Sequence, residues 1–120
     1  MKSTMFERYG GFGTVHQVVL SFYGKMLDSD VVGPYFDDVD MATLVDHQTK
    51  FISQVMGGPA SYTNEVLEQV HRNIGVSQEA FDTMAGLLQQ TLEEFDFKSE
   101  DVQAVIADIK SRQPYIVSRT

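Results

Sequence analysis

The sequence predicts an all-α fold made of one domain over residues 1–120. Apolar residues recur at helical spacing along almost the whole chain, and glycine and proline fall between the periodic stretches. No stretch alternates apolar and polar residues for long enough to form a strand. The apolar faces are broad stripes and not narrow heptad seams, which favours about four longer helices that pack at an angle over a coiled coil.

The first helices are separated by glycine and proline. A short turn through Phe6 is followed by Gly10, Gly11 and Gly13, which we expect to break the backbone before a helix that ends around residues 28–30. Segment 31–36 contains Gly-Pro and is too short for more than one or two turns. The inward face of the helix between them is predicted to consist of Val15, Val18, Val19, Phe22, Tyr23 and Met26.

The middle of the chain predicts a long helix and a short one. Asp40 is a suitable N-cap for a helix from Met41 to about Met56, which Gly57-Gly58-Pro59 terminates. Thr63 can cap a shorter helix that stops at Gly75. The predicted stripe of the long helix is Leu44, His47, Gln48, Phe51 and Val55, and that of the short helix is Leu67, Val70, His71 and Ile74.

Two more helices complete the prediction. Ser77 caps the first of them, and Ser99, followed by Glu100 and Asp101, is the expected N-cap of the last, which Pro114 ends. Their inward faces are predicted to be Phe81, Met84, Ala85, Leu88 and Leu92, then Val102, Val105, Ile106 and Ile109.

Composition and charge restrict the function. The net charge of −8 opposes binding to nucleic acid and to anionic membranes. No apolar run approaches the ~20 residues that cross a bilayer, and the N-terminal residues contain no signal core, so we expect a cytoplasmic protein without membrane insertion. The chain has no cysteine, so disulfides and thiolate metal sites are excluded.

The two histidines on apolar faces are the most informative residues. His47 and Gln48 share a stripe with Leu44 and Phe51, and His71 lies in an apolar collar on another helix. Two such imidazoles suggest one shared ligand, and an iron porphyrin between them fits, because a histidine commonly holds haem iron. Zinc would need three or four ligands, and His16 is expected to be structural or exposed. Alternatively, each histidine simply bonds a backbone carbonyl.

Tyr23 is the other polar group on an inward face. Its phenol could reach the same cavity and act beside Gln48 as a second donor to a ligand. The alternative is a hydrogen bond to the backbone, which is what most buried tyrosine hydroxyls make.

Taken together and in order, these residues identify a family resemblance. The chain resembles the group I truncated haemoglobins, which have a shortened globin fold: a two-over-two helical sandwich around a haem. The similarity covers nearly the whole chain. The matching positions are Tyr9-Gly10-Gly11, Phe22-Tyr23, Tyr35-Phe36, Asp40-Met41, His47-Gln48, Phe51, Gly57-Gly58-Pro59, Tyr62 and Val70-His71.

The resemblance implies a role for each site residue. His71 would be the proximal iron ligand, and Tyr23 and Gln48 would be distal hydrogen-bond donors. Leu44 occupies a distal position where many members carry glutamine. His47 matches the position that can bind iron as an internal sixth ligand in cyanobacterial-type members. The residues expected around the haem are Phe36, Phe51, Leu67, Val70, Ile74, Val76 and Phe81, with Lys50, Arg72 and Thr43 near its propionates.

The expected cofactor is therefore non-covalent haem b, since the chain lacks the Cys-x-x-Cys-His motif of c-type attachment. We expect a monomer that binds diatomic gas ligands: oxygen, nitric oxide and carbon monoxide. Conversion of nitric oxide to nitrate or turnover of peroxide would need a separate reductase. The alternatives are a bis-histidyl haem protein for electron transfer and, behind it, a haem-free helical interaction module.

Overall fold

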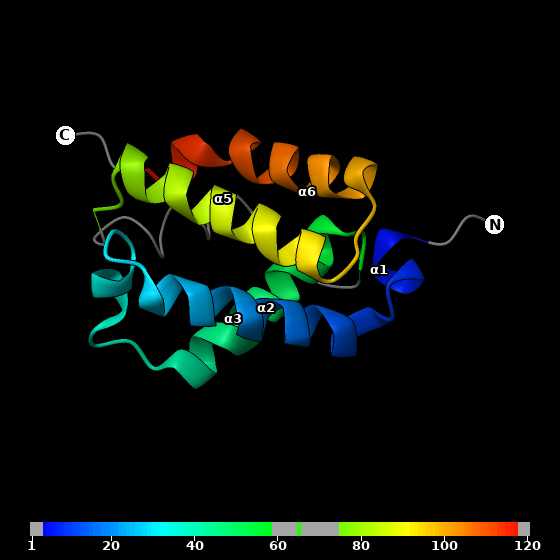
Figure 1. Cartoon of the computed structure of the whole chain (residues 1–120), viewed down its shortest axis with the longest axis horizontal. Helices are drawn as coiled ribbons and strands as arrows, with labels where there is room; N and C mark the ends of the chain where they lie inside the picture. Colours follow the sequence, from blue (N-terminus) through cyan, green and yellow to red (C-terminus); the bar gives the residue numbers. More distant parts are fainter. Residues whose placement is uncertain (1–3, 59–64, 66–74, 118–120) are drawn as a thin grey trace.

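The computed structural model describes residues 4–58, 65 and 75–117, and every regular element in these ranges is helical. None of the described helices is long and apolar enough to cross a membrane. The all-α prediction is confirmed. In chain order (Figure 1) the elements are α1 (Met5–Arg8), α2 (Gly11–Asp28), the 3-10 helix η1 (Gly33–Phe36), α3 (Met41–Val55), α5 (Gln78–Glu94), α6 (Ser99–Ser111) and the 3-10 helix η2 (Gln113–Tyr115).

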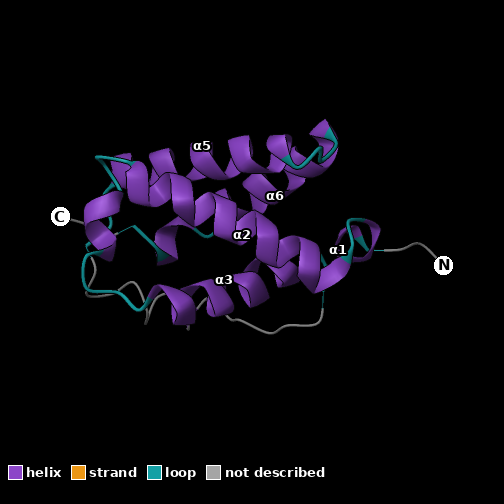
Figure 2. Cartoon of the chain, turned by 60° about the horizontal axis from the view of Figure 1, so that its bottom comes forward, coloured by secondary structure: helices purple, strands orange, loops and turns teal. Residues whose placement is uncertain are grey.

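The longer helices form two layers of two. Helix α2 packs against both α3 and α5, and α5 packs against α6. In Figure 1 the α5 and α6 pair lies above the α2 and α3 pair, and the turned view in Figure 2 again places α2 between α5 and α3. This is the two-over-two arrangement that the sequence predicted.

The core fills the space between the layers with the predicted helix faces. The largest fully buried apolar side chains are Val15, Val18, Val19, Phe81, Leu88, Leu92 and Val105. All seven were expected to face inward. Burial of such side chains contributes about 1.5 to 3 kcal/mol each, which is why the apolar stripes determine how the helices pack.

The helix starts follow the predicted caps in two cases of three. The side chain of Asp40 accepts a hydrogen bond from the Thr43 N–H, and that of Ser77 accepts one from the Ala80 N–H. The third prediction is wrong by one residue, because Ser99 is already helical and Lys98 precedes it without a side-chain cap. The two acidic residues that follow Ser99 lie in the first turn, where their charges favour the positive end of the helix.

The glycine break before α2 is shorter than predicted. Gly10 has a φ of +106°, but the helix begins at Gly11 and includes Gly13. Gly11, the first residue of the helix, also has a positive φ of +72°, so Gly10 and Gly11 together make the corner, and the prediction that Gly13 also interrupts the backbone is wrong.

A close approach at Gly33 places η1 beside the end of α2. A Cβ at Gly33 would lie 2.9 Å from the carbonyl oxygen of Leu27, so a side chain here would collide with backbone. The Gly33 N–H also donates to the Ser29 carbonyl at 2.8 Å. The tight turn brings Phe36, at the end of η1, back onto α2, where its ring meets Tyr23 edge-on at a centroid distance of 5.6 Å.

Candidate functional site

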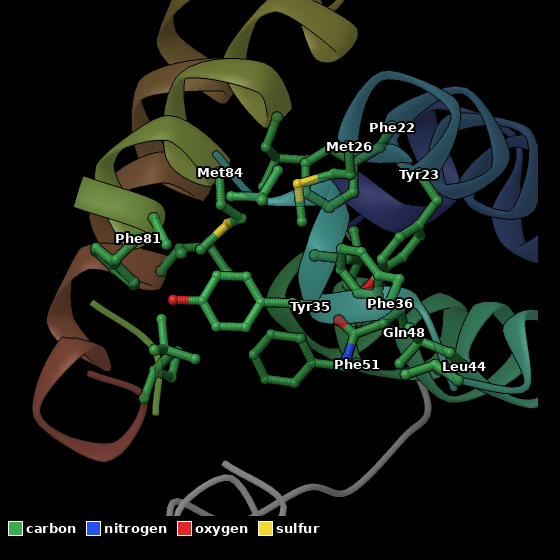
Figure 3. Close-up of a pocket in the computed structure, with 18 residues that line it drawn as sticks. Phe22, Tyr23, Met26, Tyr35, Phe36, Leu44, Gln48, Phe51, Phe81 and Met84 are labelled. Carbon is green, nitrogen blue, oxygen red and sulfur yellow. The ribbon is translucent and has the colours of Figure 1, made fainter. Parts of the chain in front are cut away.

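A cavity of about 270 Å³ lies between the two helix layers. It is close to the lower end of the ~300 to 1,000 Å³ that ligand pockets usually span. Most of the side chains around it are apolar (Figure 3). From α2 and η1 they include Phe22, Tyr23, Met26, Tyr35 and Phe36, from α3 Leu44, Gln48, Phe51 and Ile52, and from α5 and its approach Val76, Phe81, Met84 and Leu88.

Tyr23 is the most unusual residue of this cavity. Only 7% of the residue is exposed, and no hydrogen bond engages its hydroxyl within the described part of the chain. Burial raises the pKa of the phenol well above its ordinary value, so the hydroxyl keeps its proton. Among the described residues no enclosed side-chain oxygen or nitrogen lacks a hydrogen-bond partner, so the Tyr23 oxygen opens onto the cavity that the residue lines, where it can donate to a bound group.

Gln48 and Leu44 lie on the α3 side of the same cavity. Both are half-buried and one helical turn apart, so α3 presents them on one face. Figure 3 shows the side chains of Tyr23 and Gln48 extending from α2 and α3 toward the same part of the cavity. The structure therefore brings together the three residues expected on the distal side.

The residues that were predicted to surround the haem also line the cavity where the structure describes them. Phe36, Phe51, Val76 and Phe81 are all part of its walls. The guanidinium carbon of Arg112, the residue after α6, lies 5.3 Å from the centre of the Phe51 ring, so a cation stacks on one of the wall residues.

His47 does not face the cavity. Its side chain is exposed and is not among the lining residues, whereas its neighbour Gln48 is. The prediction that His47 shares the inward stripe of α3 is wrong. The buried residues of α3 are Val45, Thr49, Phe51, Ile52 and Ser53. One residue turns an α-helix by about 100°, so His47 faces away from the cavity that Gln48 lines.

The expected propionate partners on α3 are engaged elsewhere. Lys50 is exposed and pairs with Asp46 at 3.1 Å, and the Thr43 hydroxyl donates to the Asp40 carboxylate at 2.9 Å. Neither lines the cavity. The remaining predicted site residues lie outside the described residues: His71, Leu67, Val70, Ile74 and Arg72.

Sequence reasoning missed several lining residues. Met26 was assigned to the core, although its place one turn after Tyr23 could have indicated the cavity. Tyr35 could have been found from its place beside Phe36. Ile116 offered no signal, since it follows Pro114 in an irregular segment and reaches the cavity only through the packing of η2.

The residues present fit a haem. The porphyrin is a broad apolar plate, and aromatic and aliphatic side chains from both helix layers surround this cavity. The unpartnered Tyr23 hydroxyl and the Gln48 amide converge on one side of it. An apolar pocket with a few convergent polar groups is the usual form of a cofactor site.

Comparison with known proteins agrees with this geometry. The family model described as bacterial-like globin matches residues 4–117. A group 1 truncated haemoglobin of a Synechocystis species is 34% identical over 111 residues, which cover 89% of each protein. A group 1 truncated haemoglobin of Mycolicibacterium paratuberculosis is 28% identical and covers 97% of this chain and 85% of its own length.

Solved structures show the same fold. The 2/2 haemoglobin of a Synechococcus species, in the cyanomet state and with covalently attached haem, is 26% identical and superposes with a TM-score of 0.88. The match covers 98% of this chain and all of that one. Truncated haemoglobin from Tetrahymena pyriformis in the Fe(III) form, at 24% identity, has the same TM-score and the same coverage. The chain therefore belongs to the bacterial-like globin family, and its cofactor is haem.

Proposed function

We propose that this protein binds diatomic gases, oxygen and nitric oxide foremost, at a haem in the described cavity. The observation that carries the proposal is Tyr23, a buried residue that lines the cavity beside Gln48 and whose hydroxyl has no hydrogen bond within the described residues. A small ligand that accepts a hydrogen bond would satisfy this donor.

The walls would hold the cofactor by burial of its apolar faces. Phe36, Phe51 and Phe81 provide wide aromatic surfaces, and Val76 adds aliphatic contact. We propose His71 as the proximal ligand, with Leu67, Val70 and Ile74 around it and Arg72 near the propionates. A bound haem would supply the iron to which a gas binds.

Tyr23 and Gln48 would then act on the gas directly. The Tyr23 phenol stays protonated because burial raises its pKa, so it remains a donor throughout the physiological range. The Gln48 amide supplies a second N–H. A hydrogen bond to a ligand that carries partial negative charge contributes about 1.5 to 3 kcal/mol and slows the escape of the ligand. Leu44 adds no hydrogen bond and keeps that side of the cavity apolar.

Two catalytic activities at the same site would need a partner protein. Conversion of nitric oxide to nitrate, or turnover of peroxide, would require electrons from a separate reductase, because the chain has no nucleotide-binding glycine motif. Coordination of iron by His47 would require its exposed side chain to turn inward. No observation favours electron transfer by a permanently bis-histidyl haem.

The proposal is tested by the dissociation of oxygen from the ferrous, haem-loaded protein. We expect Tyr23→Phe to accelerate dissociation roughly 10- to 100-fold, which corresponds to about 1.4 to 2.7 kcal/mol. Tyr115→Phe is the matched control, since Tyr115 lies away from the cavity lining. Equal dissociation from the wild type and Tyr23→Phe would contradict the role of the Tyr23 hydroxyl.

A further inference from the structure

Tyr35 joins the two sides of the cavity. Its ring, from η1, forms part of the cavity wall, and in Figure 3 it extends across the cavity toward α5. Its hydroxyl donates a hydrogen bond to the carbonyl oxygen of Gly75 at 3.3 Å. The same hydroxyl accepts a hydrogen bond from the N–H of Ser77, also at 3.3 Å.

These two partners fix the start of α5. Ser77 is the N-cap of that helix, and its own side chain accepts from the Ala80 N–H at 3.0 Å. Val76, between the two partners, lines the cavity, as do Ala80 and Phe81 in the first turn of α5. The Tyr35 hydroxyl bonds the backbone on both sides of Val76, so it helps to position Val76, Ala80 and Phe81 in the cavity wall.

The strength of this link is modest. Hydrogen bonds from a hydroxyl are usually about 2.7 to 2.8 Å long and those from an amide N–H about 2.9 to 3.0 Å. Both contacts of Tyr35, at 3.3 Å, are therefore weak, and both are exposed to solvent. Such contacts break in local openings that leave the rest of the fold intact. The buried hydrogen bonds of α3, such as that from the Ser53 hydroxyl to the Thr49 carbonyl at 2.6 Å, have no such exposure.

We propose that the Tyr35 hydroxyl is a latch that closes one edge of the haem cavity and slows the release of haem. It is a positioning residue: it acts by holding the start of α5 against η1. Opening of the latch would free Val76 and the first turn of α5 to move away from the cofactor. The inference rests on the placement of haem in this cavity.

The experiment measures transfer of ferric haem from the loaded protein to an excess of a haem-scavenging apoglobin. We expect Tyr35→Phe, which keeps the ring and removes the hydroxyl, to accelerate release about fivefold, equivalent to about 1 kcal/mol. Hydrogen exchange of the Ser77 amide should also accelerate in Tyr35→Phe, because that N–H loses its acceptor. Tyr115→Phe should change neither rate.

A second variant separates the hydroxyl from the ring. Tyr35→Leu removes both, so the latch predicts that Tyr35→Phe already shows most of the increase seen in Tyr35→Leu. If haem release accelerates only in Tyr35→Leu, or if the Ser77 amide exchanges at the wild-type rate in Tyr35→Phe, the latch is wrong. A wild-type protein that takes up no haem would instead overturn the cofactor site itself.

Discussion

The hydroxyls of two tyrosines, Tyr9 and Tyr23, have opposite surroundings. Tyr9, at the end of α1, donates to the Asp101 carboxylate at 2.6 Å and accepts from the Lys98 N–H at 3.0 Å. Its ring stacks on Phe97 with a centroid distance of 3.8 Å. Tyr23 makes no hydrogen bond within the described residues and lines the cavity.

The difference separates a region that stabilises the fold from the cavity that we propose binds the ligand. At the junction of α1 and α6, every polar group of the cluster is paired: Arg8 also contacts both Asp101 carboxylate oxygens at 3.1 Å. Such pairing fixes the N-terminal helix against the rest of the protein. Around the cavity, by contrast, the Tyr23 hydroxyl has no partner among the described residues, so in our proposal it is available to a bound ligand.

The largest expected effect concerns the paired cluster. Asp101→Ala removes the acceptor for both Arg8 and Tyr9, and we expect the free energy of unfolding to fall by about 2 to 3 kcal/mol. Urea unfolding of the haem-loaded protein measures this. Oxygen dissociation should stay at the wild-type rate, and a large change in it would contradict the separation of the two regions.

Replacement of Tyr9 or Tyr23 by phenylalanine should affect the free energy of unfolding differently. Tyr9→Phe leaves Asp101 and the Lys98 N–H each without one partner, so the free energy of unfolding should fall by about 1 to 2 kcal/mol. Tyr23→Phe removes a hydroxyl that makes no hydrogen bond to any of the described residues, so the apoprotein should keep its stability or gain slightly. Urea unfolding of both apoproteins gives the comparison, which fails if Tyr23→Phe destabilises as much as Tyr9→Phe.

Acid should weaken the paired cluster selectively. The hydrogen bonds from Arg8 and then Tyr9 lower the pKa of the Asp101 carboxyl below its ordinary value. The stabilisation is therefore complete above the unfolded pKa of ~3.9 and is lost as the pH falls through the lower folded value. In Asp101→Asn, the free energy of unfolding should change less as the pH falls below 5. Urea unfolding at a series of pH values from 5 downward measures this. An unchanged slope would contradict the assignment.

The smallest expected effect concerns His47. Because its side chain is exposed and does not line the cavity, His47→Ala should change the stability by less than about 0.5 kcal/mol. The visible spectrum of the unliganded ferrous protein should also stay the same. Sharp low-spin bands that disappear in His47→Ala would instead establish His47 as an internal iron ligand.

Much of the architecture was predictable because it depends on local patterns. Asp40 and Ser77 mark helix starts through short-range capping, and the apolar residues of α2, α5 and α6 repeat at the helical period. These features need no knowledge of distant parts of the chain. The family resemblance likewise rested on residues at fixed spacings, and it identified Tyr23, Gln48 and Leu44 as members of one site.

The contacts between distant residues could not be predicted in this way. The pairing of Tyr9 with Asp101 spans 92 residues, and no local pattern announces it. The latch between Tyr35 and Ser77 spans 42 residues and depends on how η1 folds back over the cavity.

By itself, the sequence determined which of the described segments are helical, how residues are spaced around each helix, and which family the chain resembles. The tertiary structure decided how each helix is rotated about its axis. Adjacent residues differ by about 100° around a helix, so His47 and Gln48 were indistinguishable until the packing of α2 and η1 fixed which side of α3 lines the cavity. The physical reason is that periodicity sets relative positions on one helix, whereas the direction of a face depends on the neighbours that bury it.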